Sequence, residues 1–86
     1  MKNKLNNENM KAVVYSEPVV TKIEKKDNML HYEHFFTKSK TIEKSSFEYN
    51  IYNDTNFFLD CISKIKECMM NTYNLTEDEV VYIVQK

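Results

Sequence analysis

The clearest pattern in the chain is a pair of strand-forming runs on either side of Asp27-Asn28. Residues 19–36 read VVTKIEKKDNMLHYEHFF and are rich in β-branched and aromatic residues. Asp and Asn tolerate the positive φ that a two-residue hairpin turn requires. The pattern therefore predicts an antiparallel β-hairpin over residues 19–36, with its turn at these two residues.

The register that such a turn implies divides the hairpin side chains between two faces. Facing residues in an antiparallel pair lie close enough to stabilise each other when their chemistry is complementary. One face would hold β-branched and aromatic pairs and the other would hold polar pairs of complementary charge: Ile23–Tyr32 and Val19–Phe36, against Lys22–Glu33 and Glu24–His31. A slip of one residue would disrupt both sets, so this agreement supports the predicted hairpin.

A second pattern has the period of a helix and covers residues 55–73. Apolar and small residues recur on one face of this segment, while polar and charged residues occupy the other. The inner face would be formed by Phe58, Cys61, Ile62, Ile65, Cys68, Met69 and Thr72. Asn53, Asp54 and Thr55 are each suitable N-caps, and Asn74 can adopt the left-handed conformation that ends a helix, with Leu75 folding back.

The remaining segments give weaker patterns. Residues 11–15 predict a short strand, residues 37–46 a loop or a frayed strand, and residues 47–52 a strand with alternating faces. Residues 76–86 carry two opposed signals, because Thr76 with Glu79 forms a capping box whereas residues 80–84 are β-branched or aromatic. A helix and a strand both remain open for this segment; we expect a strand over residues 79–85.

Together these elements predict a small α+β fold. A mostly antiparallel sheet of three to five strands would pack on the amphipathic helix of residues 55–73. The polar residues 1–10 would form a flexible tail, and residues 11–86 would form a single globular domain, since 86 residues cannot supply a second core.

Composition narrows the function more by what is missing than by what is present. The chain has no glycine, and its twelve basic residues are all lysine. It therefore lacks the glycine-rich loops that cradle phosphates and the G-x-S-x-G turn of many hydrolases, and we expect no enzyme activity and no cofactor. We also find no secretory signal and no membrane-spanning segment, which predicts a cytoplasmic protein without membrane contact.

Histidine and cysteine do not combine into a reactive site. His31 and His34 are three residues apart on a predicted strand, so they would project from opposite faces and could not bind one metal ion. Cys61 and Cys68 would lie about 10 Å apart along one helix, beyond the reach of a disulfide, and both would be packed in the core. We therefore expect no metal site and no catalytic residue.

The most informative surface is the sheet face that the helix would not cover. An uncovered antiparallel face is normally polar, yet four large apolar residues project from it in the predicted register. They are Val20, Met29, Phe35 and Tyr52. The N-terminal strand or the C-terminal segment could cover them. If neither does, they predict a site for another protein or for a second copy in a homodimer. The net charge of −1 would cause only weak repulsion between two copies.

These observations lead to a functional hypothesis and an alternative. The hypothesis is a non-enzymatic protein-interaction module that docks its exposed sheet face or edge on a partner, as a regulator or inhibitor. The abundance of Asn, Lys and Ile suggests a low-GC bacterium or its mobile element as the source. The alternative is a nucleic-acid-binding domain, whose contacts would come from Lys22, Lys25, Lys26, Lys38, Lys40 and Lys44. Glu24, Glu33 and Glu43 interrupt that lysine set.

Overall fold

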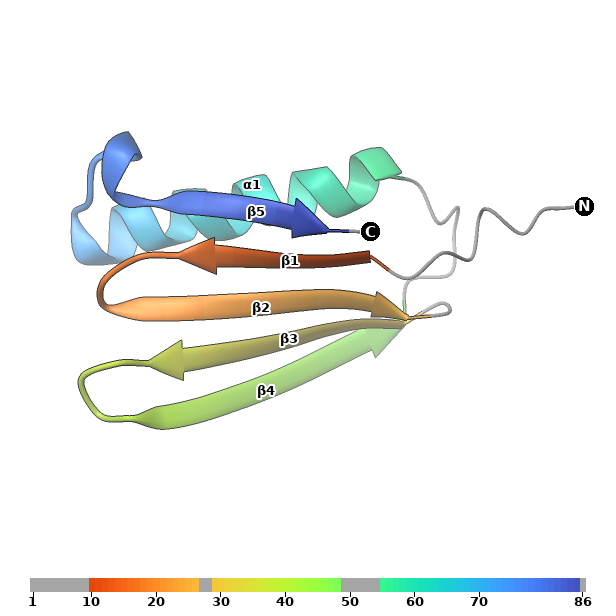
Figure 1. The fold of residues 1–86 in the computed structure, drawn as a ribbon, viewed down its shortest axis with the longest axis horizontal. Helices are drawn as coiled ribbons and strands as arrows, with labels where there is room; N and C mark the ends of the chain where they lie inside the picture. Colours follow the sequence, from red (N-terminus) through yellow and green to blue (C-terminus); the bar gives the residue numbers. More distant parts are fainter. Residues whose placement is uncertain (1–9, 27–28, 49–54, 86) are drawn as a thin grey trace, which may run out of the picture.

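The computed structural model describes residues 10–26, 29–48 and 55–85, which form a five-stranded antiparallel sheet with an α-helix across one face (Figure 1). Strands β1 (Met10–Tyr15), β2 (Val19–Lys26), β3 (Met29–Phe36) and β4 (Thr41–Glu48) follow one another as a meander. Helix α1 (Thr55–Tyr73), the 3₁₀ turn η2 (Glu77–Glu79) and β5 (Val81–Gln85) complete the fold. Because β5 pairs with β1, the strand order is β4-β3-β2-β1-β5, and the predicted α+β class is confirmed.

The predicted hairpin is present as β2 and β3, with the predicted register along its whole length. Lys26 pairs with Met29, Ile23 with Tyr32 and Val19 with Phe36. The turn at residues 27–28 lies outside the described residues. The buried positions of β2 alternate with exposed or half-buried ones, so the face that carries Ile23 is the one that packs on the helix.

The turns at the opposite end of the meander are fixed by side-chain hydrogen bonds. The buried Ser16 hydroxyl donates to the Val19 carbonyl oxygen at 2.7 Å and closes the β1–β2 turn. The Thr37 hydroxyl donates to the Glu17 carbonyl oxygen at 2.7 Å, and the Thr37 N–H donates to the Pro18 carbonyl oxygen at 3.1 Å. Thr37 therefore ties the β3–β4 turn to the β1–β2 turn.

The fourth strand corrects the sequence-based interpretation. Residues 37–46 were expected to be a loop or a frayed strand, but β4 already begins at Thr41 and pairs with all of β3. Lys40 adopts a left-handed conformation with φ 59°, and its N–H donates to the Phe36 carbonyl oxygen at 2.7 Å, which closes the turn. The predicted strand 47–52 overlaps β4 at Phe47 and Glu48, and residues 49–52 lie outside the described residues.

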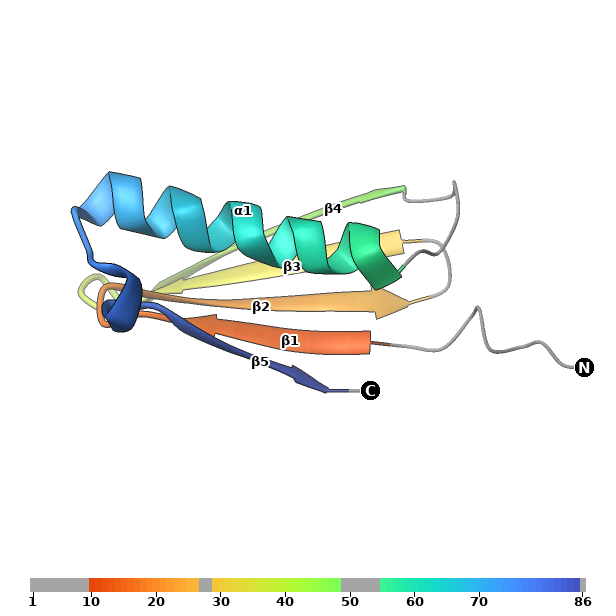
Figure 2. The ribbon, with the colours of Figure 1, turned by 90° about the horizontal axis from the view of Figure 1, so that it is seen from above.

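Helix α1 has the predicted bounds and the predicted C-terminus. Asn74 is left-handed with φ 57°, and the Leu75 N–H donates back to the Met70 carbonyl oxygen at 2.9 Å. Thr55, one of the three N-cap candidates, is the first residue of the helix, while Asn53 and Asp54 lie outside the described residues. Figure 2 shows α1 running along one face of the sheet. Phe58, Ile62 and Met69 are buried there, and α1 contacts β1 and β2.

The prediction that both cysteines are packed in the core was wrong for Cys68. Cys61 is half-buried, but Cys68 is exposed, because it lies beyond the part of the helix surface that the sheet covers. Its thiol lies 3.8 Å from the Thr72 hydroxyl on the next turn, and Thr72 is also exposed. The inner stripe of the helix is therefore narrower than the sequence pattern suggested.

The capping box and the β-branched run of the C-terminal segment each form the structure that they indicate, one after the other along the chain. The Thr76 N–H donates to the Glu79 carboxylate at 2.8 Å, so the capping box is formed, but it caps the single turn η2. The β-branched run that follows forms β5 from Val81, which confirms the expected strand. Val80, between the two, is fully buried.

The hydrophobic core lies between the sheet and the inner face of α1. It is formed by Met10, Ala12, Val14, Val19, Ile23, Leu30, Phe58, Ile62, Met69 and Val80. Met10 is therefore the buried first residue of β1 rather than the end of a tail, and residues 1–9 lie outside the described residues.

Candidate functional site

The strand register aligns apolar side chains into one row across the sheet face opposite α1. Facing residues in neighbouring strands connect β4 to β5 without a break: Ile42, Phe35, Val20, Tyr15 and Val81. We call this set the outer apolar row. Four of its members are exposed, with exposed fractions of 36–52%, and Val20 is half-buried between its neighbours. Four strand spacings make the row about 19 Å long.

The next row along the strands changes from charged to apolar as it crosses the sheet. It runs through Lys44, Glu33, Lys22, Val13 and Ile83. Ile83 is 62% exposed, the largest exposed fraction among the large apolar residues that the structure describes as exposed. Val13 and Ile83 therefore widen the outer apolar row over β1 and β5.

Of the four residues predicted to form the partner site, the structure brings two together. Val20 and Phe35 are direct cross-strand partners in the outer apolar row. Met29 also lies on the outer face, but it is at the far end of β3, between Lys26 and Glu48. Tyr52 lies outside the described residues.

Sequence reasoning missed the residues that extend the row. Tyr15, Ile42, Val81 and Ile83 each occupy an outward position of a strand, but no alternation of apolar and polar residues within these strands singles them out. Tyr15 and Ile42 align with Val20 and Phe35 through neighbouring strands of the meander, whereas the alignment of Val81 depends on the strand order β4-β3-β2-β1-β5, which places β5 beside β1.

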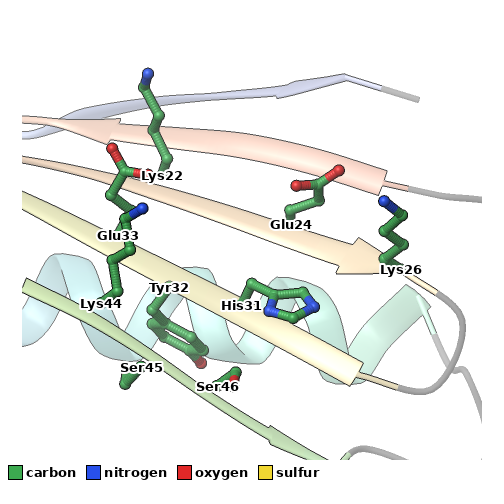
Figure 3. Close-up of a pocket in the computed structure, with 9 residues that line it drawn as sticks. All are labelled: Lys22, Glu24, Lys26, His31, Tyr32, Glu33, Lys44, Ser45 and Ser46. Carbon is green, nitrogen blue, oxygen red and sulfur yellow. The ribbon is translucent and has the colours of Figure 1, made fainter.

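A charged region occupies the rest of the outer face. Figure 3 shows Lys22, Glu33 and Lys44 on three neighbouring strands, beside Glu24 and His31. These side chains line a shallow depression of about 550 Å³ that also includes Lys26 and Ser46. Because lysines alternate with glutamates, the depression has no large excess of positive charge.

The six lysines of the nucleic-acid alternative do not form one surface. Lys25 is 1% exposed and points to the helix side of the sheet, so it cannot contact a ligand bound on the outer face with Lys22 and Lys44. Lys22 and Lys44 flank Glu33, and Lys26 lies at the end of β2. Lys38 and Lys40 lie in the turn at the opposite end of the hairpin. A phosphate backbone needs a continuous basic track, which this arrangement does not offer.

The two histidines lie on opposite faces, as predicted. His31 is exposed on the outer face opposite Glu24, whereas His34 is half-buried on the helix side. The Nδ1 atom of His34 lies 2.9 Å from the Thr21 hydroxyl, and its ring is tilted between Tyr32 and Phe36 at centroid distances of 6.1 and 6.5 Å. Among the described residues, no three His, Cys, Asp or Glu side chains gather closely enough to hold a metal ion.

A second groove lies on the helix side, between α1 and the β2–β4 strands. It has a volume of about 300 Å³, and its lining includes His34, Phe36, Glu43, Ile65 and Cys68. Nearby, burial raises the pKa of the Tyr32 phenol well above its ordinary value, and a hydrogen bond with the Cys61 thiol raises that pKa further. Folding therefore favours the protonated form of the Tyr32 phenol.

The two edges of the sheet carry different side chains. The β4 edge reads TIEKSSFE and includes Glu43, Lys44 and Glu48, which hinder the addition of a further strand. The β5 edge reads VYIVQ and has no charged residue. β5 also contains no proline, so each of its residues keeps a backbone N–H.

Comparison of the chain with protein-family models, with curated proteins and with solved structures finds no match. Within the described residues, no helix is both long enough and apolar enough to cross a membrane.

Proposed function

We propose that this chain is a non-enzymatic protein-interaction module, a regulator or inhibitor that docks the outer face of its sheet on another protein. The observation that carries the proposal is the outer apolar row, which spans all five strands on the face away from α1. Solvated faces of antiparallel sheets are normally polar, and contiguous apolar surface on a small protein usually marks an interaction site.

The chemistry around the row suits protein recognition. Phe35 and Tyr15 offer aromatic surface at its centre, and such side chains carry much of the binding energy in protein interfaces. Lys22, Glu33 and Lys44 border the row with alternating charge, which would orient a partner of complementary pattern. The row is held on paired strands, so little conformational entropy is lost when it binds.

The proposal is tested by removing apolar surface from the row without touching the core. The partner is first identified by affinity capture from the source cell, and its affinity for each variant is then measured by calorimetry. We expect the double variant Phe35→Ser/Ile42→Ser to bind this partner at least thirtyfold more weakly, which corresponds to about 2 kcal/mol. Because both side chains are exposed, the melting temperature should change little.

Met29→Ser is the matched control, because Met29 lies on the same face but outside the outer apolar row. Its affinity for the partner should equal that of the unmodified chain. Equal binding by the double variant and the unmodified chain would refute the docking role of the row. Binding to nucleic acid that weakens steeply with salt, and is lost in Lys22→Gln/Lys44→Gln, would favour the alternative function instead.

A further inference from the structure

The exposed edge of β5 has the features of a strand that pairs with another strand. Natural sheets protect their edges with charged side chains, prolines or bulges, because an open edge presents backbone groups that another strand can bind. The β4 edge has such protection in Glu43, Lys44 and Glu48, whereas residues Val81–Gln85 of β5 are uncharged. Three of the five β5 residues are β-branched, which favours the extended conformation.

We infer that β5 pairs antiparallel with β5 of a second copy of this chain, so that two five-stranded sheets join into one of ten strands. This assembly goes beyond the proposed docking of another protein, and it uses a different part of the molecule, the backbone edge of β5. A two-fold axis makes the interface isologous, since the same five residues are presented from both sides.

The sequence of β5 is compatible with pairing to itself. Ile83 is the central residue, so a two-fold axis at this position sets Ile83 opposite Ile83 of the second copy. On the helix side, Tyr82 then faces Val84 of the second copy, an aromatic and β-branched pair of the kind that stabilises sheets. Every cross-strand pair in this register is free of charge.

The charges at the two ends of β5 also complement each other in this arrangement. The turn η2, with Glu77, Asp78 and Glu79, lies directly before β5. At the other end Gln85 pairs with Lys11 of β1, whose side chain is exposed on the outer face. Antiparallel pairing brings the acidic turn of each copy toward the end of the other at which Lys11 lies, one strand in from β5, so the charges attract each other across about two strand spacings.

The outer face explains why a second copy is preferred to an unrelated strand. The row beside the outer apolar row runs from Lys44 to Ile83. Its apolar part, Val13 and Ile83, ends at the β5 edge. Pairing through Ile83 continues it into Ile83 and Val13 of the second copy. The exposed apolar surface at β5 is thereby partly covered, while the outer apolar rows of both copies stay accessible on one common face.

The short edge sets the expected strength of the dimer. Stable protein interfaces bury about 800 Å² on each partner, and five paired edge residues bury less than that. We therefore expect a reversible equilibrium between monomer and dimer rather than a permanent dimer. The equilibrium should respond strongly to one charge at the centre of the interface.

The experiment measures the dimer dissociation constant by sedimentation equilibrium for the unmodified chain and for two charge variants, Ile83→Lys and Ile83→Glu. Each variant alone should remain monomeric at concentrations at which the unmodified chain dimerises, because like charges would face each other across the axis. An equimolar mixture of the two variants should recover dimers, since Lys then faces Glu. Ile83 is 62% exposed, so neither change should disturb the fold.

Ile42→Lys is the matched control, because Ile42 is a similarly exposed isoleucine on the opposite edge strand. It should dimerise as the unmodified chain does. A chain that stays monomeric at every concentration, or a mixture of charge variants that fails to form dimers, would overturn the inference. The double variant Phe35→Ser/Ile42→Ser separates the two proposals, because it should lose the partner protein and keep the dimer.

Discussion

At the scale of single residues, the absence of glycine changes how the chain makes its turns. Lys40 and Asn74 hold left-handed backbone, with φ values of 59° and 57°. Asparagine tolerates this conformation better than most residues do, but for lysine it costs about 1–2 kcal/mol through the clash of its Cβ atom. The turn at Lys40 therefore contains backbone strain that the pairing of β3 and β4 has to balance.

We predict that Lys40→Gly raises the free energy of unfolding by about 0.5–1 kcal/mol, because glycine removes the Cβ clash at a cost in chain entropy. Urea unfolding followed by circular dichroism measures the change. Lys38→Gly, in the same turn but without a positive φ, provides the comparison and should not stabilise the fold. A loss of stability in Lys40→Gly would show that the turn is not strained.

Tyr32 gives the fold a dependence on alkaline pH. Its folded-state pKa lies above the ordinary value of about 10, so folding favours the protonated phenol. The contribution of this phenol to the free energy of unfolding is fully present below about pH 10, the pKa of tyrosine in the unfolded chain. It is lost as the pH rises above that value. Unfolding free energies measured on both sides of pH 10 should therefore fall on the alkaline side, and Tyr32→Phe should reduce that fall. Tyr15→Phe, which removes the hydroxyl of an exposed tyrosine, is the control variant.

At the scale of elements, sequence patterns predicted the segments whose local chemistry and packing agree. The β2–β3 hairpin follows from complementary cross-strand pairs, and α1 from an apolar stripe that ends at Asn74. The same patterns missed the start of β4, because Thr41, Glu43 and Ser45 are exposed even though they lie on the helix side. β4 is a strand because it pairs with β3. Its own sequence does not alternate between apolar and polar residues, so the pattern gave no sign of a strand.

Thr37 provides a prediction about how two elements are joined. Its hydroxyl donates to the Glu17 and Pro18 carbonyl oxygens at 2.7 and 3.2 Å, which links the two turns at this end of the sheet. Thr37→Val keeps the shape of the side chain but removes the donor, so we expect a loss of about 1 kcal/mol. Thr37→Ser retains the hydroxyl and should lose less. Thermal unfolding of the three proteins compares them, and equal stability would contradict the role given to this hydroxyl.

At the scale of the whole molecule, the candidate site was predictable only in part. Val20 and Phe35 could be paired from the sequence because they belong to one hairpin with a fixed register. Val81 could not be aligned with them, since this needs the position of β5 beside β1, across a whole helix, whereas Tyr15 faces Val20 through the local pairing of β1 with β2. Met29 was placed on the correct face, but the distance along the strand separates it from the row.

The same placement of β5 has a consequence for the order of folding. Strands β1 to β4 pair with their neighbours in sequence, whereas the β1–β5 ladder joins residues 11–15 to residues 81–85. Contacts between distant segments form late, since a long loop must close first. During synthesis β1 would therefore remain an open edge until β5 leaves the ribosome, and in that interval newly made chains are most exposed to aggregation and to capture by chaperones.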